Sequence, residues 1–204
     1  SSGLVSVAGT SGAARASVLL LGDGRFYLAG GGSDGEVARL TAEGALDTDF
    51  GTAGVATVDI GTTEFNVTDA GLDPQGRIIL GGFTWDGSTS DMAAARITYD
   101  GVLDTTFSGD GFASTDFFGL EDLATSVVGQ LDGKVVRGGW AEATAGNADV
   151  ALVRYDTDGG LDTTFDGDGR CTDRYTTTGK ERMAAIAAQE DGKLLALGGW
   201  SSDW

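Results

Sequence analysis

The sequence predicts an all-β fold, a β-propeller or a partial propeller, built from four-stranded antiparallel blades with about 57 residues per repeat. Three observations lead to this prediction. The chain repeats itself at a long period, short apolar runs alternate with glycine-rich turns, and no segment sustains the 3.6-residue periodicity of a helix. A repeat period of this length is typical of propellers and solenoids.

Three sequence markers define the repeat. The segment Leu46–Phe50 (LDTDF) returns as LDTTF at 103–107, after 57 residues, and again at 161–165, after a further 58 residues. The second marker is a turn containing glycine, followed by an apolar run and a glycine pair, at 23–31, 75–82, 132–139 and 191–199. The third is an apolar run that ends in arginine, at Arg39, Arg96 and Arg154. Because the three markers stay in phase, we treat the period as structural.

The third unit illustrates the expected strands. A first strand covers 124–128, and the Asp132-Gly133 turn leads into a second strand over 134–140. Asp-Gly favours a tight hairpin because glycine tolerates the positive φ that such a turn requires. A third strand is expected over 150–155 and a fourth over 170–175. Four short strands per unit correspond to one propeller blade.

The repeated residues have structural explanations. The glycine pairs allow strands to approach closely, and the aromatic residues that follow three of them, Phe83, Trp140 and Trp200, are expected to pack between blades. In the LDTTF segments, leucine and phenylalanine are expected to anchor a loop while the Asp and Thr side chains hold the turn. Cys171 aligns with Ala56 and Ala113, which predicts a buried, inert thiol.

We predict one repeat domain over residues 1–204. Its expected segments are the end of one blade, three successive repeats and the start of a further blade, at 1–21, 22–72, 73–129, 130–188 and 189–204. The chain holds about 3.6 units, whereas closed propellers have about four to eight blades. We therefore expect either a fragment of a larger propeller or a subunit that further copies complete.

Charge and composition exclude several functions. Lys+Arg is 13 and Asp+Glu is 31, so the net charge is −18, and such a surface repels nucleic acids and anionic membranes. The absence of histidine removes Ser-His-Asp catalysis and His-ligated zinc. A single cysteine excludes an intrachain disulfide. No apolar run reaches the length of a membrane-spanning helix, so we expect neither nucleic-acid binding nor membrane insertion.

The acidic loops of the third unit are the only candidate metal site. Carboxylates flank glycine turns there, an arrangement that hard cations such as calcium favour, at Asp156, Asp158, Asp162, Asp166 and Asp168. The segment does not fit the EF-hand pattern, and turn-forming Asp-Gly chemistry explains the same residues without a metal. No other cofactor and no catalytic residue is predicted.

These motifs together resemble the delta-60 repeat family of bacterial proteins. The matching segments are DGK followed by an apolar run and GGW, then VALVRY, DGGLDTTF and GDG, at 132–140, 150–155, 158–165 and 167–169. The resemblance implies a β-propeller-like array in a secreted or cell-surface bacterial protein. It provides no catalytic residue. The first unit departs from the pattern, with Leu40 where the family has tyrosine and GTAG at 51–54 in place of the GDG segment.

From these observations we expect a non-catalytic scaffold, extracellular or on the cell surface of a bacterium, that mediates protein or ligand binding. Its expected partner is a different protein or further copies that complete the propeller. Two alternatives stay open. One is a polysaccharide-acting enzyme that uses carboxylates, and the other is a structural subunit of a larger complex.

Overall fold

A computed structural model describes residues 17–61, 63–176 and 180–201, and in this part of the chain every regular element is a strand. The first sheet contains β1 (Ser17–Leu20), β2 (Phe26–Gly30), β3 (Gly35–Leu40) and β4 (Val55–Val58). The second contains β5 (Glu64–Leu72), β6 (Ile78–Trp85), β7 (Ser90–Ile97) and β8 (Phe112–Thr115). The third contains β9 (Asp122–Gly129), β10 (Val135–Thr144), β11 (Asn147–Tyr155) and β12 (Arg170–Asp173). The fourth pairs β13 (Lys180–Ala188) with β14 (Leu194–Ser201).

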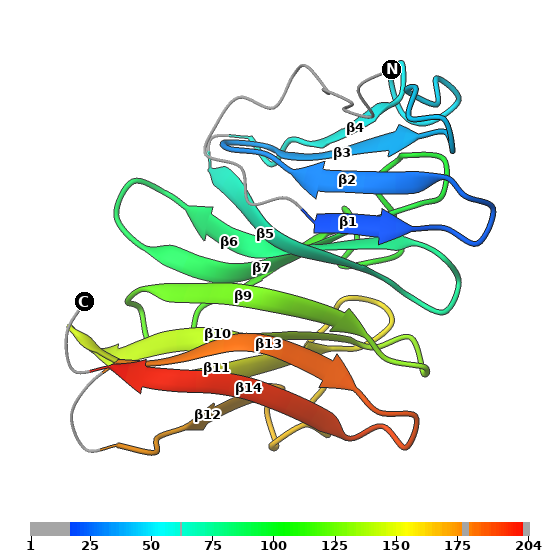
Figure 1. Ribbon diagram of the computed structural model, residues 1–204. Helices are drawn as coiled ribbons and strands as arrows, with labels where there is room; N and C mark the ends of the chain where they lie inside the picture. The colour runs from blue at the N-terminus through cyan, green and yellow to red at the C-terminus, as the bar shows by residue number, and fades with distance from the viewer. Residues whose placement is uncertain (1–16, 62, 177–179, 202–204) are drawn as a thin grey trace.

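The sheets are antiparallel meanders that follow one another along the chain and pack face to face. The first sheet lies at the top of Figure 1, the second beneath it and the third at the bottom. β13 packs against β9, β10 and β11, which continues the series. The predicted fold class is therefore confirmed, and the four strands expected in the third unit correspond to β9 through β12.

Two hydrophobic cores hold neighbouring sheets together. The first lies between the first and second sheets and includes Tyr27, Phe50 and Phe65. The second joins the second sheet to the third and includes Ile79 and Val127. Each core takes side chains from two sheets, because a single sheet cannot bury its own apolar face. The stacking of sheets is thus what excludes water from these residues.

A β-bulge at the first strand explains one glycine of the pair in the second, third and fourth sheets. The first strand carries one extra residue, Thr68 in β5 and Thr125 in β9, opposite the glycine-rich second strand. A Cβ atom added to Gly139 would lie 1.9 Å from the main-chain oxygen of Leu123. The same 1.9 Å separates an added Cβ at Gly82 from the oxygen of Asn66. No side chain fits at these positions, so the glycines are required by close backbone approach.

The prediction for Trp200 is wrong. Trp140 is 5% exposed and has the Arg182 guanidinium 4.9 Å from its ring centroid, whereas Trp200 is 66% exposed. Between the turn glycine and the glycine pair, the fourth unit has one residue more than the second and third units. The first glycine of its pair, Gly198, therefore lies at the bulge, where the third unit has the second glycine, Gly139. A shift of one residue turns every following side chain to the opposite face of a strand. Trp200 therefore points away from the position that Trp140 occupies.

The prediction for Cys171 also needs correction. Its strand position matches those of Ala56 and Ala113, as expected, since all three pair with the corresponding residue of the third strand. Both alanines are buried, but the Cys171 side chain is only half-buried. Partial burial, with Asp166 nearby, raises the pKa of its thiol, which keeps the unreactive thiol form at neutral pH.

The sheets and the expected segments divide the same repeat at different points. The sheets cover 17–58, 64–115, 122–173 and 180–201, whereas the expected boundaries separate the first strand of each sheet from the second. Of the segment 1–21, expected to be the end of one blade, residues 1–16 lie outside the described residues. In the described part of the chain, no helix is long and apolar enough to span a membrane.

Candidate functional site

A buried arginine–aspartate pair forms the turn after the third strand of the second sheet. Asp104 accepts hydrogen bonds from Nε of Arg96 at 2.8 Å and from Nη1 of Arg77 at 3.0 Å. It also accepts from the main-chain N–H and the hydroxyl of Thr106. Burial alone would raise the pKa of Asp104, but the hydrogen bonds from Thr106 and Arg96 outweigh burial and hold that pKa below its ordinary value. The guanidinium of Arg96 also lies over the Phe107 ring, 4.8 Å from its centroid.

The same turn recurs in the neighbouring sheets. Asp162 accepts from Nε of Arg154 at 2.6 Å, and Asp47 accepts from Nε of Arg39 at 2.8 Å. The expected bonding of Asp and Thr side chains within the turn is therefore present, but the arginine partner was missed. A signal for it exists in the sequence, since the arginine precedes the aspartate by eight residues each time.

The five residues predicted to bind calcium do not converge on one point. Asp162 is paired with Arg154 and, at 2.7 Å, with Nζ of Lys134. Asp158 and Asp168 each accept a main-chain N–H two residues further on, as turn-forming aspartates do. Asp156 lies 3.5 Å from Nζ of Lys134, and Asp166 adopts a positive φ of 50°. These contacts argue against a calcium site here and favour the turn-forming explanation.

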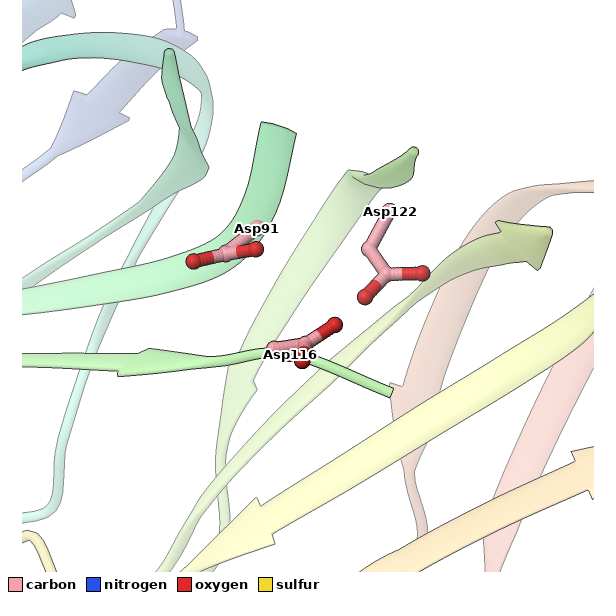
Figure 2. Close-up of side chains that lie close together, drawn as sticks. All are labelled: Asp91, Asp116 and Asp122. Carbon is pink, nitrogen blue, oxygen red and sulfur yellow. The ribbon is translucent and has the colours of Figure 1, made fainter. Parts of the chain in front are cut away.

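A different acidic cluster lies where the second sheet meets the third. Asp91 is the second residue of β7, Asp116 directly follows β8, and Asp122 begins β9. One carboxylate oxygen from each lies within 4.8 Å of the other two, and among the described residues no other group of three or more Asp, Glu, Cys or His side chains is as close. Figure 2 shows the carboxyl groups of Asp116 and Asp122 facing each other, with Asp91 beside them. Sequence reasoning missed this cluster because its members lie in β7, directly after β8 and in β9, without a recognisable spacing.

Burial sets the electrostatics of the cluster. Asp122 has no solvent exposure, and its Oδ2 accepts the main-chain N–H of Phe117 at 2.7 Å. Its Oδ1 is buried and has no hydrogen-bond partner among the described residues. Burial, together with the charges of Asp116 and Asp91, raises the pKa of Asp122 to about 7, although the Phe117 hydrogen bond and the charge of Arg170 lower it. Burial also raises the pKa of Asp91. Three carboxylates this close are stable only if a cation lies between them or if one of them is protonated.

The stacked four-stranded sheets, the bulge glycines and the repeated arginine–aspartate turn define a β-propeller-type repeat protein. A family model described as "Domain of unknown function (DUF5122) beta-propeller" matches three segments of the chain, residues 20–50, 74–107 and 130–165. Each match ends on the phenylalanine of the LDTTF-type turn, and the matches begin 54 and 56 residues apart. The three matches are consistent with a β-propeller repeat family. None of the curated proteins compared with the chain matches it.

Proposed function

We propose that this protein is a non-catalytic scaffold that binds a protein partner or further copies of itself through the open face of its fourth sheet. The proposal includes the delta-60 assignment and the bacterial extracellular or cell-surface location that this assignment implies. The observation that carries it is the exposure of apolar side chains on β14.

The fourth sheet exposes a position that the other sheets bury. Tyr27, Ile79 and Val136 each lie three residues after the turn glycine, and all three are fully buried. Leu195 holds the same position in β14 and is 57% exposed. Among the described residues, β14 pairs only with β13, whereas the second strand of every other sheet is paired on both sides. An exposed apolar strand with an unpaired edge favours association with other β-structure.

Two further exposed apolar regions are open to a partner. Leu197 and Trp200 are exposed and line a groove with Val150 and Tyr175 at the boundary with the third sheet. Val18 of β1 is also exposed, and Figure 1 shows the first sheet, which contains β1, at the opposite end of the stack. Two apolar ends on one stack permit head-to-tail association, which closes into a ring when the rotation fits.

Polar substitution of the β14 face tests this proposal. We expect the wild-type chain to self-associate, with a light-scattering mass near twice 20.7 kDa. The double variant Leu195→Ser/Leu197→Ser is expected to shift this mass to that of a monomer. Val102→Ser is the matched control, because Val102 is exposed in the segment between β7 and β8, away from this face. A wild-type mass of one chain at all concentrations would rule out self-association and leave only a different protein as the partner.

The alternative, a carboxylate-based polysaccharide-acting enzyme, would find its acid at Asp122. A pKa of about 7 suits a general acid. However, Asp122 has no solvent exposure, so a glycosidic oxygen cannot reach it. We therefore expect no release of reducing ends from acidic or neutral polysaccharides. Turnover that Asp122→Asn abolishes would favour the enzyme instead.

A further inference from the structure

Three carboxylates meet at the junction of the second and third sheets, and none of them is paired with a cation of the described residues. In the described part of the protein, no Lys or Arg forms an ion pair with Asp91, Asp116 or Asp122. Arg170 approaches the cluster, and its charge lowers the pKa of Asp122, but its Nη1 donates to the main-chain oxygen of Asp116, at 2.8 Å, and not to a carboxylate. Like charges this close repel one another, so the junction needs compensation from elsewhere.

The next junction, between the third and fourth sheets, has the same three positions, occupied by Asp149, Arg174 and Glu181. Arg174 directly follows β12 as Asp116 directly follows β8. Glu181 is the counterpart of Asp122. Glu181 accepts the main-chain N–H of Tyr175, the residue after Arg174, just as Asp122 accepts the main-chain N–H of Phe117, the residue after Asp116.

The aspartates of the third strand also correspond. The residue after Asp149, Val150, pairs with the last residue of β12. The residue after Asp91, Met92, pairs with the last residue of β8. Strand register therefore places the two clusters at equivalent points of successive junctions, so that one can be compared with the other residue by residue.

The second cluster contains its own cation. Nε and Nη2 of Arg174 donate to the two carboxylate oxygens of Asp149, at 2.8 and 3.0 Å. Hydrogen bonding and charge from Asp149, followed by the charge of Glu181, raise the pKa of Arg174. Two carboxylates and one guanidinium have a net charge of −1 when all are ionised. Asp116 replaces the guanidinium by a third carboxylate, so the ionised cluster at the earlier junction has a net charge of −3.

We propose that Asp91, Asp116 and Asp122 bind a calcium ion, which joins the second and third sheets as Arg174 joins the third and fourth. Three carboxylates from different strands form an oxygen-only ligand set, which hard divalent cations prefer. Calcium lies about 2.3–2.6 Å from its ligands, so one ion can contact oxygens that lie within 4.8 Å of one another. A divalent ion also brings the net charge from −3 to −1, the value of the neighbouring junction.

The orphaned oxygen of Asp122 is the independent indication of a ligand. A buried ionised oxygen without a donor is costly, and native proteins rarely keep one without an ion or water beside it. Oδ1 of Asp122 is such an atom, in a side chain that the Phe117 N–H holds at the cluster. Asp116 is exposed, so water can complete the coordination from the solvent side.

Calorimetric titration of the full chain, stripped with chelator and then titrated with calcium chloride, tests the site. We expect saturable binding of one ion per chain, and Asp116→Asn is expected to weaken it by about tenfold or more, because affinity depends on ligand charge. Asp59→Asn is the control, since Asp59 directly follows β4 but the position of Asp122 is occupied there by the buried Phe65. Equal loss in both variants, or no saturable binding by the wild type, would overturn the proposal.

A second variant tests whether a calcium ion at the earlier junction takes the place of the Arg174 guanidinium at the later one. This test does not require a measured affinity for calcium. Asp116→Arg recreates the Asp149–Arg174–Glu181 arrangement at the earlier junction. We expect calcium to raise the thermal midpoint of the wild type. The Asp116→Arg variant is expected to have this higher midpoint already without calcium, and added calcium is expected to leave its midpoint unchanged. A variant that still gains stability from calcium as the wild type does would contradict the site.

Discussion

Replacement of Gly139 by alanine is expected to lower the free energy of unfolding by about 3 kcal/mol or more. The added Cβ would lie 1.9 Å from the oxygen of Leu123 and 2.7 Å from Cα of Ala124, both backbone atoms of β9. Neither atom can move without breaking the pairing of β9 with β10, because both strands are hydrogen-bonded through this bulge. The effect can be measured by urea denaturation followed by circular dichroism.

Gly199→Ala is the matched control for this substitution. Gly199 is also the second glycine of its pair, but an added Cβ there has no atom of the described residues within 4 Å. We expect a change within about 0.5 kcal/mol, as for other substitutions without new contacts. Equal destabilisation by the two variants would mean that the fourth unit is not shifted by one residue relative to the third.

Replacement of Asp104 by alanine is expected to cost about 3–5 kcal/mol, because it removes the charge partner of a buried guanidinium. Arg96 is 1% exposed and keeps only neutral partners in the variant, the main-chain oxygen of Thr157 and the hydroxyl of Thr106. Thr106 also loses its own acceptor. The loss should appear in thermal and urea unfolding alike.

Two further variants separate charge from packing at this turn. Asp104→Asn keeps an acceptor oxygen and is expected to lose less stability than Asp104→Ala. Asp100→Ala removes an exposed carboxylate in the preceding turn and is expected to have little effect. If Asp104→Ala changes stability no more than Asp100→Ala does, the buried pair does not stabilise the turn.

Much of the fold could be predicted because its determinants are local. Asp132-Gly133 favours a hairpin through the conformation of the glycine itself, and Gly133 does adopt a positive φ of 87°. Short runs such as Val150–Tyr155 are read as strands from their own residues. The prediction failed at Trp200, where aligning the glycine pairs hid the extra residue that precedes them. Strand register is decided by pairing with a neighbour, which local composition does not reveal.

The candidate sites show the same division. The acidic loop around Asp162 attracts attention in the sequence because its carboxylates are close in the chain, yet Lys134 and Arg154 already neutralise that aspartate. Asp91 and Asp122 are separated by 31 positions and have no recognisable spacing. Only the approach of β7 and β8 to the start of β9 brings them together.

The sequence by itself determined the repeat, the turns and the strands of this protein, because each depends on residues within one hairpin. The tertiary structure decided which side chains are buried and which charges are paired. Contacts between sheets join residues about one repeat apart, such as Arg96 with Thr157 or Asp69 with Val127, which are 61 and 58 positions apart. Burial and charge compensation depend on these distant partners, since a carboxylate is stable in the interior only with a cation or a donor beside it. Asp122 has a donor for Oδ2 but, among the described residues, none for Oδ1, and this arrangement arises only when the sheets assemble.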